Sequence, residues 1–112
     1  MRVAPRAPHG AMNNYIPVST LSELREGQGI TVFAAGRNVA LFKIDGEILA
    51  LDGICPHKGA PLGMGWCEDG VVACPMHGWR FIIRTGDCLD APDRPATPLP
   101  VRINGETIEV AL

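Results

Sequence analysis

Two short segments of the chain carry residue types that bind soft metals. Cys55 and His57 form a first pair, and Cys74 and His77 form a second, with sixteen residues between the pairs. A proline follows each cysteine, and a glycine lies shortly after each histidine. This repetition predicts two short loops that close on one metal centre from opposite sides.

Thiolate sulfur and imidazole nitrogen suit zinc or an iron–sulfur centre and argue against magnesium or calcium. Two cysteines and two histidines are enough for a closed tetrahedral zinc site, so structural zinc is one interpretation. However, zinc motifs more often place two to four residues between paired ligands. Only one residue separates Cys55 from His57, and each pair is mixed. The spacing therefore favours an iron–sulfur centre and leaves zinc as the alternative.

The pattern Cys-x-His, followed after sixteen residues by Cys-x-x-His-Gly, resembles the Rieske iron–sulfur proteins, in which two histidines replace two cysteines on one iron. The resemblance extends over residues 55–62 and 74–81 and includes Arg84-Thr85-Gly86, whereas Ile82 departs from the acidic residue that many members carry there. It implies one [2Fe–2S] cluster per chain. Cys55 and Cys74 would hold one iron, and His57 and His77 would hold the other.

The resemblance also points to a subtype. High-potential members of the family carry an additional cysteine in each loop, and the two are joined as a disulfide. Here Ala60 and Met76 stand at those positions, and Trp79 stands where those members place a serine hydroxyl near a sulfide. The chain therefore resembles the soluble, low-potential ferredoxins. We expect a reduction potential toward the lower end of the Rieske range of roughly −150 to +300 mV.

By this resemblance, the chain is expected to carry one electron at a time from a flavin-dependent reductase to a Rieske-type oxygenase, with both partners docking near His57 and His77. Once these two are used, only His9 remains, which is too few for a mononuclear iron site of two histidines and a carboxylate. The chain also lacks a Gly-x-Gly-x-x-Gly dinucleotide motif. An electron-transfer protein is therefore expected, not an enzyme.

Two other functions stay open from the sequence. One is an accessory electron-transfer subunit of a nitrite-reductase-like or other oxidoreductase complex. The other is an interaction module that zinc stabilises.

Length and charge set further limits. A chain of 112 residues is the size of one domain. Residues 1–14 contain Arg2 and Arg6 and no acidic residue, and we interpret them as a flexible tail. Residues 15–112 then hold eight basic and twelve acidic residues, within a net charge of −2 for the whole chain. This acidic balance argues against a nucleic-acid partner.

The sequence contains no apolar run of about twenty residues, the length that spans a bilayer, and no secretory signal. We therefore expect a cytoplasmic protein without a membrane partner. A reducing compartment favours metal binding over disulfides for the cysteines. Cys67 and Cys88 lie outside the ligand pattern and are interpreted as buried small apolar residues.

Thirteen glycines, ten prolines and short apolar runs between turn residues predict an all-β, Rieske-type antiparallel sandwich or barrel. It should cover residues 15–112, with a small cluster-binding subdomain at about 53–88. Hairpin turns are expected at Asp45-Gly46 and Asn104-Gly105. The predicted strands are 15–18, 30–34, 38–44, 47–51, 71–73, 81–84, 100–103 and 106–110.

The sequence also leads to expectations for shorter segments and for single side chains near the ligand loops. Residues 19–24 should form a short helical turn, and residues 90–100 should lack regular structure. Met64 and Met76 are expected to pack around the cluster. Trp66 and Trp79 are explained equally well by docking, by shielding the cluster or by simple packing. The glycines near 63–65 either direct N–H groups at the cluster sulfurs or only form turns.

Overall fold

The computed structural model of the chain describes residues 14–55, 59–76 and 78–112. Over these ranges, regular structure consists of ten β-strands and two single-turn 3-10 helices, without an α-helix. All three sheets pair their strands in antiparallel fashion, which confirms the predicted fold class. No helix in this part of the chain is long and apolar enough to cross a membrane. The predicted tail lies almost wholly outside the described residues, and the domain boundaries stay predictions.

The middle sheet is built from two hairpins in sequence order, with a short strand added at its edge. Three of its strands were predicted to within about two residues. The turn between the second and third is tight, because Asp45 and Gly46 both have positive φ (52° and 79°). The strand order is β2 (Gly29–Ala34), β3 (Arg37–Ile44), β4 (Glu47–Asp52) and β8 (Pro98–Leu99).

A second sheet joins the two ends of the described chain in the order β1 (Tyr15–Thr20), β10 (Thr107–Ala111) and β9 (Val101–Asn104). Strand β1 lies at the edge of this sheet, as Pro17 predicted, since proline cannot donate to a central ladder. The predicted helical turn is shorter than expected. Residues 19 and 20 belong to β1, and only Leu21–Glu23 forms the 3-10 helix η2.

Strand β3 is buried on both of its faces, and it connects two hydrophobic clusters. Val39 and Leu41 pack with Ile108 of β10, whereas Ala40 and Phe42 pack on the opposite side, where the candidate site lies. All four β3 residues are fully buried. Because side chains alternate between the faces of a strand, one strand can anchor the framework and the site at once.

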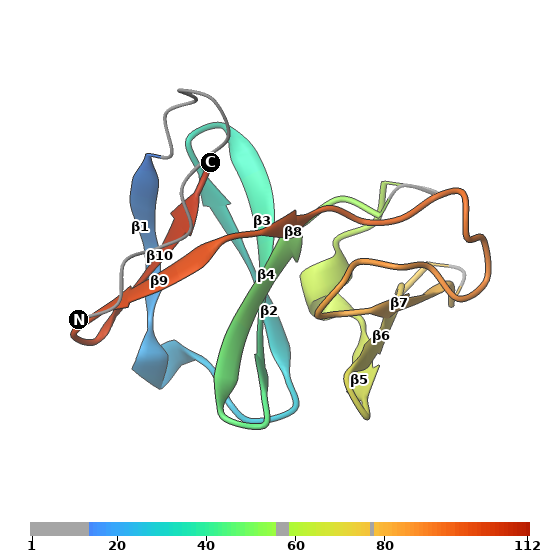
Figure 1. The fold of residues 1–112 in the computed structure, drawn as a ribbon, viewed down its shortest axis with the longest axis horizontal. Helices are drawn as coiled ribbons and strands as arrows, with labels where there is room; N and C mark the ends of the chain where they lie inside the picture. The colour runs from blue at the N-terminus through green and yellow to red at the C-terminus, as the bar shows by residue number, and fades with distance from the viewer. Residues whose placement is uncertain (1–13, 56–58, 77) are drawn as a thin grey trace.

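The third sheet contains β5 (Trp66–Glu68), β6 (Val71–Ala73) and β7 (Arg80–Ile82). Figure 1 shows it at one end of the molecule, beside the middle sheet and away from β1, β9 and β10. Strand β5 was not predicted, and β7 is shorter than predicted, because residues 83 and 84 belong to a turn. A 3-10 helix, η3 (Leu62–Met64), precedes β5.

Residues 90–100 run from the third sheet back to the framework, and their last part is regular. The prediction of an irregular segment holds until Pro98, where β8 begins to pair with β4. Two backbone hydrogen bonds hold the approach to β8: Ala96 N–H donates to Gly86 O (2.8 Å), and Asp52 N–H donates to Thr97 O (2.7 Å). The segment is therefore tied to both sheets.

Candidate metal centre

The first cysteine loop starts at Cys55, just after β4, and closes on itself. The N–H of Cys55 donates to the carbonyl oxygen of Ala60 (2.8 Å), and the N–H of Gly59 donates to the carbonyl oxygen of Cys55 (2.8 Å). Gly59 has a φ of 76°, in the left-handed region that glycine adopts without steric cost. The loop thereby reverses the backbone within six residues.

The second cysteine loop repeats both hydrogen bonds at the same spacing. The N–H of Cys74 donates to Trp79 O (2.7 Å), and the N–H of Gly78 donates to Cys74 O (3.0 Å). Gly78 has a φ of 75°, within a degree of its counterpart in the first loop. The repeated sequence pattern thus corresponds to two loops of the same backbone design.

Both cysteines are directed into the protein. Cys55 is 1% exposed and Cys74 is fully buried, and both belong to the hydrophobic cluster that contains Phe42 and Phe81. Strand β4 leads into the first loop, and β6 leads into the second. The framework and the small sheet therefore each present one thiol to the same apolar region.

The two loops lie next to each other, because one hollow of about 400 Å³ is lined by residues from both. Most of these residues are apolar. They are Gly59, Ala60 and Pro61 of the first loop, Pro75 and Met76 of the second, and Met64 of η3.

These residues fit the sulfur side of an iron–sulfur centre. Two buried cysteines in matching loops can supply two thiolates to one iron, and apolar surroundings exclude water from it. The predicted imidazole ligands, His57 and His77, lie outside the described residues. Within the described part, no three His, Cys, Asp or Glu side chains form a group that could hold a metal ion.

Gly63 in η3 and Gly65 directly after it serve close packing. A Cβ on Gly63 would overlap the carbonyl oxygen of Ile30, and one on Gly65 would overlap that of Ala73. The N–H of Gly65 donates to Leu62 O (3.0 Å). The N–H of Gly65 thus closes a turn, and close packing is a further reason for glycine at both positions. The interpretation that N–H groups of this segment point at a cluster sulfur stays a prediction.

An ion pair that the sequence did not reveal holds the strand that leaves the second loop. The carboxylate of Asp90 accepts three hydrogen bonds from Arg80: from the backbone N–H (2.8 Å), from Nε (3.1 Å) and from Nη2 (2.8 Å). The hydrogen bond from the guanidinium is the main reason that the pKa of Asp90 lies below its ordinary value. Asp90 stands ten residues beyond Arg80 in an irregular segment, so no periodicity pointed to it.

This ion pair should affect the reduction potential in opposite directions, depending on which partner is removed. Asp90→Asn leaves a positive charge next to the second loop and should raise the potential, whereas Arg80→Met leaves a negative charge and should lower it. Each shift should be on the order of tens of millivolts, because exposed charges are partly screened. Redox titration at neutral pH measures both, since the lowered pKa keeps the native Asp90 ionised there.

The matched control for this titration is Glu47→Gln, which removes the exposed ion pair with Arg84 (2.6 Å) between β4 and the turn after β7. Its shift should be smaller than either of the other two. Shifts of the same sign for Asp90→Asn and Arg80→Met would show that the pair acts through loop structure and not through charge.

The tryptophans and methionines expected around the cluster differ in burial. Trp79 is half-buried against the hydrophobic core, so packing accounts for it. Trp66 is 72% exposed, and Met64 and Met76 are 69% and 59% exposed. The simple packing explanation is therefore wrong for Trp66. Both methionines line the hollow between the loops, so their packing around the cluster stays a prediction.

The two remaining cysteines differ in burial. Cys88 is 3% exposed and belongs to the hydrophobic core, which confirms its interpretation as a buried apolar residue. Cys67 is only half-buried, and burial raises the pKa of its thiol. Both thiols are free of disulfides.

Two matched loops that each bury a cysteine, mounted on an antiparallel β framework, fit the class of iron–sulfur proteins. The Rieske [2Fe-2S] domain profile matches residues 14–104, and the chain belongs to this family. Its cofactor is accordingly a Rieske-type [2Fe–2S] cluster. The zinc interpretation is not supported.

Among curated relatives, the ferredoxin component of a naphthalene 1,2-dioxygenase system of Pseudomonas aeruginosa is 34% identical over 99 residues, covering 88% of this chain and 95% of the relative. Among solved structures, the ferredoxin of carbazole 1,9a-dioxygenase from Nocardioides aromaticivorans IC177 superposes with a TM-score of 0.78 at 29% identity. That match covers 87% of this chain and 96% of the other.

A protein of Mycobacterium tuberculosis described as an NADH-dependent nitrite reductase small subunit superposes with a TM-score of 0.82 at 27% identity. The match covers 91% of this chain and 97% of that one. The relatives named as ferredoxin components are electron carriers of dioxygenase systems and not the catalytic enzymes themselves.

Proposed function

We propose that this chain is a one-electron carrier, a Rieske ferredoxin that passes electrons from a flavin-dependent reductase to a Rieske-type oxygenase. In this proposal Cys55 and Cys74 bind one iron of the cluster, and His57 and His77 bind the other. One cluster is bound per chain. The observation that carries the proposal is the pair of cysteine loops with matching hydrogen bonds and almost complete burial of both thiols.

When bound, the [2Fe–2S] cluster takes up and releases one electron. The chain's own residues provide its surroundings. Buried Cys55 and Cys74 keep water from the sulfur side, and the Arg80–Asp90 pair holds the backbone just beyond the second loop. The two loops lack the additional cysteines of high-potential members, since Ala60 and Met76 stand there. This absence supports a potential in the lower part of the range.

The proposed partners follow from the relatives, several of which are named as ferredoxin components of aromatic-ring dioxygenase systems. Both partners would dock at the end of the molecule that carries the two loops, near His57 and His77. A cytoplasmic location is part of this proposal.

Electron paramagnetic resonance of the dithionite-reduced full chain tests the ligand assignment. The expected spectrum is rhombic, with an average g value below that of clusters bound by four cysteines, because nitrogen ligands alter the reduced iron. Iron and acid-labile sulfide should each be found at about two atoms per chain.

The double variant His57→Cys/His77→Cys is the matched comparison, because it replaces nitrogen by sulfur donors at the same two positions. Its average g value should rise toward that of an all-cysteine cluster. An unchanged signal in this variant would disprove the histidine assignment.

A second candidate is an accessory electron-transfer subunit of a nitrite-reductase-like complex. Its support is the similarity to the Mycobacterium tuberculosis small subunit, which has the highest TM-score among the structures compared above. Copurification from the native host separates the two functions. A large catalytic subunit that stays bound at high dilution favours the accessory subunit, whereas a free chain that exchanges between partners favours the ferredoxin.

A further inference from the structure

Three large apolar side chains at the end of the molecule that carries the cysteine loops are more than half exposed. Met64, Trp66 and Met76, which we term the apolar strip, are 69%, 72% and 59% exposed. They are connected through Met64, which lines both the hollow between the loops and a neighbouring groove that Trp66 also lines. Contiguous exposed apolar side chains of this size commonly mark an interaction site.

The local backbone structure keeps the side chains of this strip exposed to solvent. Gly63 and Gly65 pack against backbone carbonyls of β2 and β6. These contacts hold the backbone of Met64, which lies between them. Trp66 begins β5 opposite Ala73, the residue before Cys74. Since side chains alternate along a strand, half-buried Cys67 faces the core while Trp66 and Glu68 face solvent.

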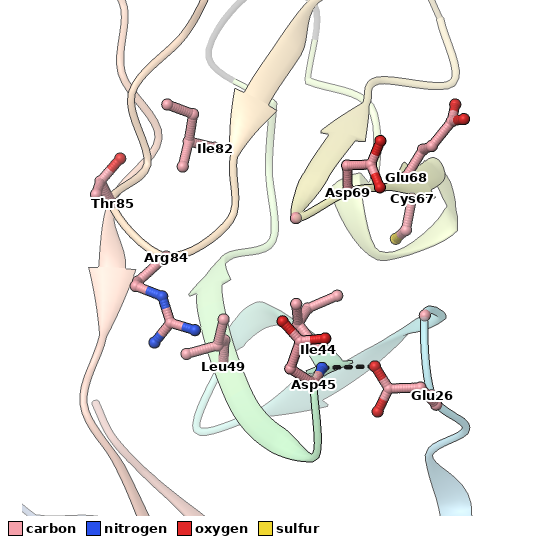
Figure 2. Close-up of a pocket in the computed structure, with 12 residues that line it drawn as sticks. Glu26, Ile44, Asp45, Leu49, Cys67, Glu68, Asp69, Ile82, Arg84 and Thr85 are labelled. Atoms are coloured by element: carbon pink, nitrogen blue, oxygen red, sulfur yellow. Dashed lines mark hydrogen bonds between the residues drawn. The ribbon is translucent and has the colours of Figure 1, made fainter.

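Acidic residues border the strip on the side of the β5–β6 hairpin. Glu68 and Asp69 at its tip are exposed, and Asp69 faces Glu26 and Asp45 across a cleft of about 580 Å³ (Figure 2). Among the described residues, none of these four carboxylates forms an ion pair. Their negative charge therefore remains available to a partner.

The positive charge in this cleft is already engaged. Arg84 lines the cleft, but its Nη1 lies 2.6 Å from a carboxylate oxygen of Glu47. Glu26 accepts hydrogen bonds from the backbone N–H groups of Asp45 (2.5 Å) and Gly46 (2.9 Å), which fixes its carboxylate at the cleft wall. The cleft thus carries a net negative charge beside an apolar surface.

We propose that the apolar strip and the acidic β5–β6 hairpin together form a docking surface for an electron-transfer partner whose contact face has an apolar centre bordered by lysine or arginine. This inference rests on the proposed function and specifies the partner's chemistry and the side of the loops on which it sits. The apolar strip supplies desolvated contact, and the acidic hairpin steers the partner toward it.

The test uses cytochrome c as the probe, because lysines surround its exposed haem edge. The reduced full chain is mixed with it by stopped flow over a range of salt concentrations. Glu68→Gln/Asp69→Asn should slow the second-order reaction about threefold at low salt, with the difference lost at high salt. Met64→Gln/Trp66→Gln should slow it about fivefold at every salt concentration.

The matched control is Glu23→Gln/Glu106→Gln, which removes the same two charges at the other end of the molecule, in η2 and the β9–β10 turn (Figure 1). Its rate should stay within about 1.5-fold of the native chain. Equal slowing by the two charge variants would overturn the proposal, because net charge alone would then account for it. So would a native rate for the strip variant.

Acid-labile sulfide and the reduced-state spectrum of every variant accompany these rates. A native chain without a cluster would disprove the proposed function itself. A native chain that holds a cluster and reduces cytochrome c, with all variants equally fast, would disprove only the docking surface.

Discussion

Cys74→Ala is expected to leave the chain without its cluster, with iron and acid-labile sulfide below about a tenth of the native content. The physical reason is that no neighbouring cysteine can take the place of the Cys74 thiolate as a ligand. Cys74 is fully buried inside a closed loop, and Cys88, which shares its hydrophobic cluster, already packs in the core. The measurement is metal and sulfide analysis of the purified variant together with its visible spectrum.

Cys88→Ala is the control for this experiment, since it removes a thiol of similar burial from the same hydrophobic cluster. The small cavity left behind costs about 1 kcal/mol in each variant, and Cys74→Ala should lose the cluster's contribution to stability as well. Only Cys74→Ala should lose iron. If Cys74→Ala retained native iron and sulfide, or if Cys88→Ala lost them equally, Cys74 would not be a ligand.

Gly65→Ala should destabilise the folded chain by about 3 kcal/mol or more, which is the second large effect. The backbone of Gly65 (φ −78°, ψ 177°) is open to any residue, so conformation alone would allow alanine. Steric exclusion decides the outcome, because the new Cβ would overlap the carbonyl oxygen of Ala73 and approach Val72 Cγ2 to 2.9 Å. Urea unfolding of the cluster-loaded chain, followed by far-ultraviolet circular dichroism, measures the change.

Gly36→Ala provides the contrasting case, in the turn between β2 and β3. Gly36 has a φ of 76° with open space where a Cβ would be, so its substitution should cost only about 1 to 2 kcal/mol of backbone strain. The Gly65 variant should also lose the visible absorbance of the cluster at lower urea, because Ala73 directly precedes Cys74. Equal destabilisation by the two substitutions would argue against the close contact as the cause.

The strands that the sequence predicted well are those with strong local signals. Residues 38–44 and 47–51 alternate or run apolar around Asp45-Gly46, and the structure has β3 and β4 there with that turn. Local turn chemistry and apolar periodicity determine such a hairpin without help from the rest of the chain.

Strands β5 and β8 were not predicted from the sequence, because their segments carry no strong local signal. Each is only two or three residues long, and each forms because a neighbouring strand offers a free edge: β6 for Trp66–Glu68, and β4 for Pro98–Leu99. A segment this short has no periodicity to read, so tertiary pairing determines its conformation.

The sequence by itself determined the family, the cofactor and the two cysteine loops, because ligand type, spacing and a glycine at the left-handed position are local properties. Only the tertiary structure decided which neighbours act on the loops. It joined Asp90 to Arg80 across ten residues, packed Trp79 inward and left Trp66 exposed. Those outcomes depend on how separate segments meet in space, and no short-range pattern encodes a meeting of that kind.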